Sequence, residues 1–346
     1  MTTILCTLYN SFYLDKGLVL YDSLCKCAND FKLYVLCMDN KCYDVLSDLH
    51  QEYHIPIRLS DFEEGDKELL TAKLNRSFGE YCWTCAPSII LYILNRFNEK
   101  CCTYIDADMY FYSDPQILVN EMLAAGKSVM ITPHRFSIDN MRLVRYGIYC
   151  VEFNTFVNES KSLDVLRKWK QDCLDCCTSI YDGVHYGDQK YLDAWPECYP
   201  KVVHVCQNPG AGLAPWNIEW YQAKDLNKHI VFFKRDNVEI PIVFYHFQHV
   251  TYMTRSHIRT GIEAKKNNVD YGLVDFLYTE YLNKIEVKKK FLESRYNVDY
   301  LMQEHPVQNS APKTLKSRLR EVRFIYKIYR FIFLKKNKMQ HEIFLH

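Results

Sequence analysis

The first third of the chain alternates short apolar runs with stretches that repeat their apolar residues at helical spacing. The runs at 2–9 and 33–38 have the length of strands, and the stretch 14–28 between them has helical periodicity. An apolar run without polar alternation is typical of a parallel strand that is buried on both faces. This alternation predicts an α/β domain built on a parallel sheet. Further strands are expected over 55–59, 101–105 and 128–132, and further helices over 42–53, 78–98 and 114–125.

The second half of the chain carries more predicted strands than helices. Strands are expected over 148–157, 202–206, 230–233 and 240–247, and helices over 163–177 and 274–296, with a loop rich in glycine and proline at 209–217. We predict a main domain over 1–260, a helical region packed on it over 261–304, and a linker with a terminal tail over 305–346.

Two carboxylates follow the apolar strand that begins at Cys101. Asp106 and Asp108 are separated by one residue, and in an extended chain such positions point to the same side. Buried carboxylates need a positive partner, and a divalent cation with its preference for oxygen ligands is a suitable one. We therefore predict an Asp-X-Asp metal site that holds the diphosphate of an activated sugar. The alternative is an Asp pair that caps the next turn or faces water.

Other candidate residues lie at the ends of the predicted strands. Ligands of open α/β sheets bind beyond the carboxyl ends of the strands, where Tyr9 and Asp39 stand together with the Asp-X-Asp pair. No Gly-X-Gly-X-X-Gly motif follows the first strand, so a dinucleotide cofactor is not expected.

Composition indicates a reducing environment. The chain has 15 cysteines, an odd number without a repeating framework, and its N-terminus shows no secretory signal. Both features favour a cytoplasmic protein with free thiols. The pairs Cys82/Cys85 and Cys173/Cys176 have the spacing of metal ligands, but we expect them to be structural thiols on helices rather than a zinc site.

Charge is concentrated at the C-terminal end. Residues 313–338 contain ten basic residues and one acidic residue, although the net charge of the whole chain is only +1. Apolar residues recur there every three or four positions from Leu315 to Phe333, with Lys and Arg beside them. This pattern predicts a basic amphipathic helix that lies on an anionic membrane surface; the alternative is a helix docked on the protein or on a second subunit. General nucleic-acid binding is not expected, because the rest of the chain is acidic.

Five short motifs occur in an order that resembles a known family. They are Asp106-Ala-Asp108, Phe-Asn154, Asp188-Gln189, Trp216-Asn217, and a strand that ends in Tyr-His246-Phe. The series resembles the nucleotide-sugar glycosyltransferases of the GT-A fold and is most similar to family 8, which includes bacterial lipopolysaccharide sugar transferases and glycogenin. The resemblance spans residues 3–260. It implies a Rossmann-like α/β fold with a mixed central sheet, followed here by a helical tail.

The resemblance also implies roles for these residues. His246 is the third protein ligand beside Asp106 and Asp108, and an imidazole among oxygens favours Mn²⁺ over Mg²⁺. Asn154 and the pair Asp188 and Gln189 contact the donor sugar near the reacting carbon. The remaining residues line the donor and acceptor sites: Trp216 and Asn217 form a wall for the acceptor, and Tyr9 and Asp39 contact the nucleobase and ribose. Each residue also has an ordinary alternative, such as a core histidine for His246 or a helix cap for Asp188.

The chain departs from the family pattern in two places. Family 8 members usually carry His-X-Gly-X-X-Lys, but here the run is His246-Phe-Gln-His249 and onward to Arg255, without the glycine and lysine. His249 or Arg255 is a candidate for the missing positive charge. The usual arginine before the Asp-X-Asp strand is also absent, because the segment 80–87 contains no arginine.

Taken together, the sequence predicts a metal-dependent glycosyltransferase. It moves a hexose from a nucleoside-diphosphate sugar, in particular a UDP-sugar, to a glycan or glycolipid acceptor in lipopolysaccharide or capsule synthesis, with retention of configuration. The predicted location is the cytoplasm, peripheral on the inner face of the membrane. The alternatives are a sugar-nucleotide pyrophosphorylase, whose basic glycine-rich loop is not seen after the first strand, and a non-catalytic nucleotide-sugar-binding protein.

Overall fold

The computed structural model describes residues 2–252, 257–263, 268–298 and 340–344. The chain forms two compact units, one of residues 1–248 with 268–298 and one of residues 249–267 with 299–346. The larger unit contains every residue of the five motifs, together with Tyr9 and Asp39.

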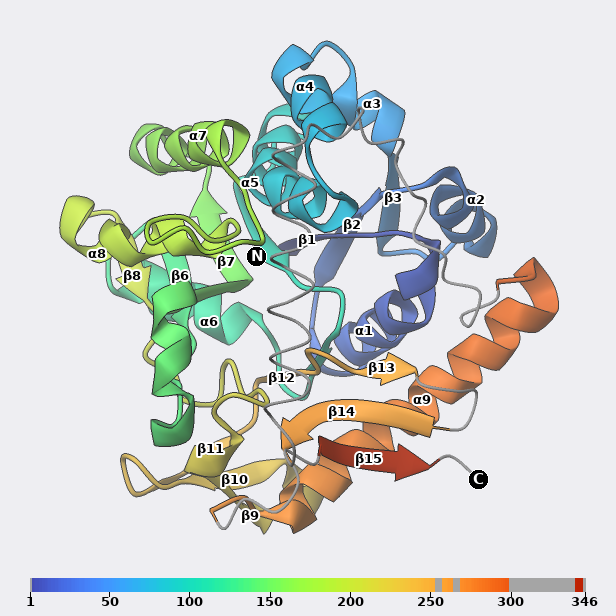
Figure 1. Ribbon diagram of the computed structural model, residues 1–346, viewed down its shortest axis with the longest axis vertical. Helices are drawn as coiled ribbons and strands as arrows, with labels where there is room; N and C mark the ends of the chain where they lie inside the picture. Colours follow the sequence, from blue (N-terminus) through green and yellow to red (C-terminus); the bar gives the residue numbers. More distant parts are fainter. Residues whose placement is uncertain (1, 253–256, 264–267, 299–339, 345–346) are drawn as a thin grey trace, which may run out of the picture. The chain divides into compact units, whose positions relative to one another are not determined.

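A seven-stranded sheet forms the centre of the larger unit, with the strand order β3-β2-β1-β4-β7-β6-β8 (Figure 1). β1 pairs in parallel with β2 and β4, and β2 pairs in parallel with β3. β7 runs antiparallel to both β4 and β6. The predicted mixed α/β sheet is therefore confirmed. The strand bounds are β1 Thr3–Tyr9, β2 Phe31–Cys37, β3 His54–Arg58, β4 Cys101–Ile105, β6 Val129–Pro133, β7 Tyr149–Val157 and β8 Val203–Val205.

Most predicted helices are present with ends shifted by a few residues. The bounds are α1 Leu14–Cys27, α2 Asn40–Leu49, α5 Phe78–Arg96, α6 Gln116–Ala124, α7 Ser160–Asp175 and α9 Tyr271–Tyr296. The sequence analysis missed the short helices α3 Leu59–Glu63, α4 Lys67–Asn75 and α8 Trp195–Cys198. Local side chains explain where helices begin. At α5, Ser77 and Glu80 form a capping box, in which each side chain accepts from the other residue's backbone N–H.

The core of the larger unit fixes the strand ends that carry the candidate site. On one side, α5 and α7 pack together, and the fully buried ring of Trp169 on α7 stacks 6.0 Å from Phe156 of β7. On the other side, α1 packs against α9, and Phe247 stacks 3.7 Å from Tyr281 of α9. Burial of such large aromatic rings is a major source of stability.

The prediction of one strand over 240–247 is wrong in one respect, because the structure has two strands there. β11 (Val238–Pro241) pairs with β10 (Ile230–Phe233), which also pairs with β9 (Tyr221–Asp225). β12 (Phe244–His246) pairs antiparallel with β5 (Met109–Phe111) instead. β11 ends at Pro241, the N–H of Ile242 still donates to the carbonyl of His229 at 2.9 Å, and the chain changes partner after that bond. This exchange places His246 opposite Met109, directly after the Asp-X-Asp motif.

The smaller unit contains an antiparallel sheet in the order β13-β14-β15. Its strands are β13 Thr251–Tyr252, β14 His257–Glu263 and β15 Gln340–Phe344. The predicted linker at 305–311, the predicted amphipathic helix at 313–338 and Arg255 lie outside the described residues. Among the helices that are described, none is both long and apolar enough to cross a membrane.

Candidate metal centre

Asp106 and Asp108 lie on a turn between β4 and β5, and not on an extended strand as the sequence analysis assumed. β4 ends at Ile105 because the chain leaves the large sheet there to pair with β12. The turn is tied at both ends: the Asp106 N–H donates to the carbonyl of Glu152 at 3.3 Å, and the Asp108 carbonyl accepts from the N–H of Phe247 at 2.9 Å. The argument from strand alternation was therefore wrong, although both carboxylates still face one point.

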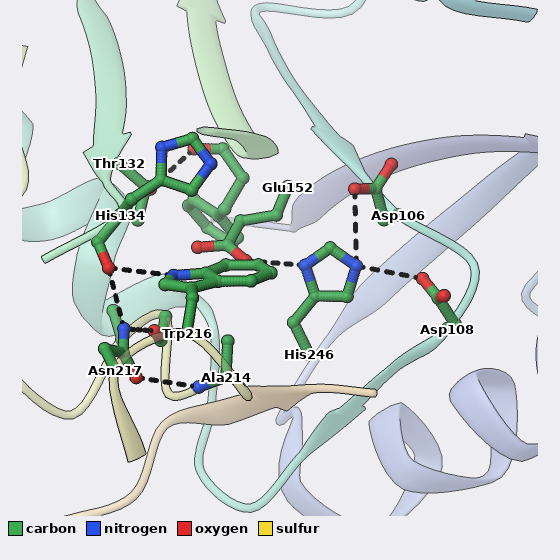
Figure 2. A network of polar contacts seen from close by, with 12 residues as sticks. Asp106, Asp108, Thr132, His134, Glu152, Ala214, Trp216, Asn217 and His246 are labelled. Atoms are coloured by element: carbon green, nitrogen blue, oxygen red, sulfur yellow. Dashed lines mark hydrogen bonds and ion pairs between the residues drawn. The ribbon is translucent and has the colours of Figure 1, made fainter. Parts of the chain in front are cut away.

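That point is the imidazole of His246, which is only 2% exposed. Its Nε2 atom lies 3.1 Å from Oδ1 of Asp108 and 3.7 Å from Oδ2 of Asp106 (Figure 2). One ligand atom from each of the three side chains lies within 4.8 Å of the other two. Two carboxylate oxygens and one imidazole nitrogen at this spacing suit a divalent cation such as Mn²⁺ or Mg²⁺. The donor set therefore fits the predicted metal.

Electrostatics in this cluster favour a bound cation. Burial raises the pKa of Asp106, and the charges of Asp108 and Glu152 raise it further against the opposing effect of His246. Burial alone would lower the pKa of His246, but Asp108 and Glu152 hold it well above its usual value. Three carboxylates thus share one imidazole. This excess of negative charge is costly to bury without a positive partner.

Two residues of the centre were missed by the sequence analysis. Glu152 on β7 is fully buried, and its Oε2 lies 2.7 Å from Nδ1 of His246. Lys16 on α1 is 6% exposed, and although burial lowers its pKa, the charges of Tyr13 and Asp108 contribute to a net rise. Glu152 could have been found, because it stands two residues before Asn154 on a predicted strand and so shares its side. Nothing in the helical pattern marked Lys16.

Asp188 and Gln189 lie at the start of the short 3₁₀ helix Gln189–Ala194. The Asp188 side chain is buried, and burial together with the charge of Asp106 raises its pKa to about 8. The carbonyl of Asp188 accepts from Nε1 of Trp169 at 2.9 Å, and Nε2 of Gln189 donates to the carbonyl of Tyr146 at 2.9 Å. The charge of Asp106 thus acts on Asp188, and the predicted contact of Asp188 and Gln189 with the donor sugar stays a prediction.

Trp216 and Asn217 support the centre from beside the imidazole (Figure 2). The Trp216 ring meets His246 edge-on at 5.3 Å, and its Nε1 donates to the carbonyl of His134 at 2.8 Å (Figure 2). Asn217 is fully buried; its amide donates to the carbonyls of His134 and Gly212 and accepts from the N–H of Ala214. These bonds hold the loop 209–217 in place. The predicted contact of both residues with an acceptor stays a prediction.

Asn154 is also fully buried on β7. In the amide orientation that pairs donors with acceptors, its nitrogen donates to the carbonyls of Cys150 at 3.3 Å and Phe153 at 3.0 Å. The structure therefore gives this side chain a hydrogen-bonding role within its own strand, and its predicted contact with the donor sugar stays a prediction.

Tyr9 and Asp39 stabilise the loops that follow β1 and β2. The Tyr9 side chain is buried, with its hydroxyl 3.2 Å from Nε2 of His54. Asp39 caps α2 by accepting from the N–H of Cys42 at 2.7 Å, and its other oxygen accepts from the N–H and hydroxyl of Ser11. A nucleoside would therefore contact the backbone at Tyr9 rather than its side chain. The predicted contact of Tyr9 and Asp39 with the nucleobase and ribose stays a prediction.

Fold and site together define a mixed α/β protein with an acidic-imidazole centre beyond the strand ends. No family model matches the chain. The chain is 35% identical over 257 residues to the uncharacterized protein YfnD of Bacillus subtilis (strain 168), a match that covers 72% of this chain and 78% of YfnD. It is 28% identical over 308 residues to YfnF of the same organism, which covers 86% of this chain and 97% of YfnF. The chain belongs to the family of YfnD.

Several solved glycosyltransferases have a chain trace similar to that of this protein. The galactosyltransferase LgtC, crystallised with donor and acceptor sugar analogues, has a TM-score of 0.49 at 11% identity, covering 81% of this chain and 95% of LgtC. Mouse xyloside xylosyltransferase 1 has a TM-score of 0.46 at 12% identity, covering 72% of this chain and 98% of that chain. The glycosyltransferase GlyE of Streptococcus pneumoniae TIGR4 has a TM-score of 0.46 at 14% identity, covering 85% of this chain and 64% of GlyE.

Proposed function

We propose that this protein is a metal-dependent glycosyltransferase that takes a hexose from a nucleoside-diphosphate sugar, with UDP-sugars as the first candidates. The single observation that carries the proposal is the convergence of Asp106, Asp108 and His246 from two distant parts of the chain. Two carboxylates that follow the parallel strand β4, together with an imidazole from β12, suit a cation that binds a diphosphate.

Asp106, Asp108 and His246 would hold Mn²⁺ or Mg²⁺. When bound, the cation neutralises negative charge on the diphosphate that leaves the sugar. Lys16 is a buried lysine whose pKa is raised in part by the charge of Asp108, and it is our candidate for the role of the lysine that is missing from the His246 motif. A buried ammonium group at this place would stabilise phosphate oxygens without reorganisation during the reaction.

Asp188 would orient the donor sugar. Burial raises the pKa of its carboxyl group, and the charge of Asp106 raises it further. The carboxyl oxygens are able to accept hydrogen bonds from sugar hydroxyls, and the protonated form is also able to donate one. The bond from Trp169 fixes its backbone, and the bond from Gln189 to Tyr146 fixes the next residue. We further propose that the acceptor is a glycan or glycolipid, that configuration is retained, and that residues 313–338 attach the enzyme to the inner face of the membrane.

The proposal is tested by incubating the full chain with a panel of nucleoside-diphosphate sugars, with and without Mn²⁺. A glycosyltransferase releases nucleoside diphosphate and free sugar slowly when water replaces the acceptor, and we expect this release from one donor in the presence of the metal. Binding of nucleotide without release of sugar from any donor, even with glycan acceptors added, would identify a binding protein. Formation of nucleoside triphosphate after addition of pyrophosphate would identify a pyrophosphorylase.

A further inference from the structure

Glu152 contacts the opposite side of the His246 ring from the two aspartates. Its Oε2 lies 2.7 Å from Nδ1, whereas Asp108 lies 3.1 Å from Nε2 (Figure 2). Glu152 is 0% exposed and His246 is 2% exposed, so neither side chain is free to turn toward solvent. The imidazole is therefore held at both nitrogens by carboxylates from different elements.

This contact decides which nitrogen of His246 faces the aspartates with a lone pair. A neutral imidazole carries one proton, and only the other nitrogen is able to bind a cation. A carboxylate that accepts a hydrogen bond from Nδ1–H keeps the proton on Nδ1 and makes Nε2 the more basic ligand. Nε2 is the nitrogen that faces Asp106 and Asp108.

The backbone around Glu152 makes its position rigid. The next residue, Phe153, pairs with Ile105 at the end of β4, and the carbonyl of Glu152 accepts from the N–H of Asp106. One residue thus holds the aspartate turn with its main chain and the histidine with its side chain. Gly212 permits this packing, because a Cβ there would lie 2.8 Å from Oε1 of Glu152.

Stability does not explain a carboxylate at this position. Oε1 of Glu152 has no hydrogen-bond partner among the described residues, and a buried polar atom without a partner costs about 1–3 kcal/mol. A residue that costs stability and contacts a candidate ligand is better explained by the site that it serves.

We propose that Glu152 is a positioning residue of the metal centre, which holds the Nδ1 proton of His246 and thereby presents Nε2 to the cation. This inference rests on the proposed function and deepens it, because it adds a residue that sets the affinity and ligand geometry of the centre. It requires no contact between Glu152 and the cation or the donor sugar.

The first test measures Mn²⁺ affinity by titration with electron paramagnetic resonance detection of free Mn²⁺. We expect Glu152→Leu to weaken binding by about 10- to 100-fold, the usual effect of losing such a partner. Glu152→Gln keeps a weaker acceptor and should fall between Glu152→Leu and the original chain. Glu63→Gln is the matched control: Glu63 is also a buried carboxylate, which accepts from Tyr81 and Lys73 at 2.6 Å and 2.8 Å, and its loss should leave Mn²⁺ affinity unchanged.

The second test separates positioning from a general structural role. Electron spin echo measurements on bound Mn²⁺ detect the nitrogen of a coordinated imidazole, and ¹⁵N-histidine labelling identifies it. We expect this coupling in the original chain and its weakening or loss in Glu152→Leu, with both aspartates still binding. If Glu152→Leu fails to fold, the same measurement on Glu152→Gln tests whether the nitrogen coupling weakens.

Unchanged affinity and unchanged nitrogen coupling in the Glu152 variants would overturn the inference, and so would a lower melting temperature with no change in either property. A different result would contradict the proposed function itself. In that case the original chain binds no Mn²⁺, or the Asp108→Asn variant binds Mn²⁺ as tightly as the original chain does.

Discussion

The imidazole of His246 lies 3.1 Å from the carboxylate of Asp108, although 138 residues separate them in the chain. The contact exists because β12 pairs with β5, which places His246 opposite Met109. A strand pair outside the main sheet therefore closes the candidate metal centre, and the loop 209–217 supports it through Trp216.

The stability of the protein should fall as the pH drops below 6.5, in part because of His54. This residue is buried on β3 and stacks on Tyr21 at 4.7 Å, and burial lowers its pKa to about 3. The unfolded chain binds a proton to this histidine near pH 6.5 while the folded chain does not, so unfolding is favoured from pH 6.5 down to about 3. At pH 5 the effect amounts to about 2 kcal/mol.

Urea unfolding at pH 7 and pH 5 measures this effect. His54→Asn should lose about 2 kcal/mol less than the original chain between the two values. The control is His50→Asn, since His50 is exposed in a left-handed conformation with φ of 47°, which asparagine tolerates. It should keep the original pH dependence. An identical dependence in the His54 variant would show that this group does not titrate as expected.

Arg135 should stabilise the loop that supports His246. Its guanidinium donates to the carbonyls of Ala211 at 2.6 Å, Cys206 at 2.9 Å and Asn208 at 3.0 Å. Replacement by alanine leaves these carbonyls without their donor and should lower the free energy of unfolding by about 2–4 kcal/mol. It should also speed proteolysis within 206–217. Arg235→Ala, at an exposed position, is the control; equal effects of the two substitutions would contradict the assigned role.

Trp169 should connect the core to the segment that we propose contacts the donor sugar. Its indole N–H donates to the carbonyl of Asp188 at 2.9 Å, so Trp169→Phe removes that donor as well as part of the ring. We expect a loss of about 2–3 kcal/mol in stability and a lower kcat with the donor sugar. Trp195→Phe shortens the neighbouring ring, which packs edge-on at 5.5 Å, and should reduce stability with little change in kcat. Equal kcat values for both variants would contradict the link to Asp188.

The basic stretch 313–338 should bind anionic membranes. Deletion is a poor test, because residues 340–344 form β15 and pair with β14. Replacing Lys316, Arg320, Arg323 and Arg330 with glutamine removes four positive charges and should weaken binding to phosphatidylglycerol vesicles at least tenfold, since each basic residue contributes about 1 kcal/mol. Turnover of a soluble acceptor should not change. Undiminished vesicle binding would show that these basic residues do not attach the protein to anionic membranes.

The sequence predicted the sheet well because its buried strands are short apolar runs between helices of clear periodicity. It also grouped Asp106, Asp108 and His246 through a family resemblance in motif order, and the structure brings their ligand atoms within 4.8 Å of one another. What it could not predict is the geometry that joins them. The strand over 240–247 looks continuous, and only the pairing of its two halves with different partners shows the break between Pro241 and Phe244.

Residues outside motifs were harder to find. Glu152 stands in a predicted buried strand, where a carboxylate looks out of place until a histidine from β12 is seen at 2.7 Å. Lys16 lies in an amphipathic helix, where a lysine is ordinary. The roles proposed for both residues depend on contacts between segments that are distant in the chain. Such contacts leave no local pattern in a single sequence.

The most direct test of the account measures UDP binding by calorimetry, with and without Mn²⁺, for the original chain, Asp108→Asn, and Asp61→Asn as an exposed control. The account predicts that Mn²⁺ tightens UDP binding at least tenfold in the original chain and in Asp61→Asn, and has no effect in Asp108→Asn. UDP affinity that is the same with and without Mn²⁺ in the original chain, or a metal effect that survives in Asp108→Asn, would contradict it.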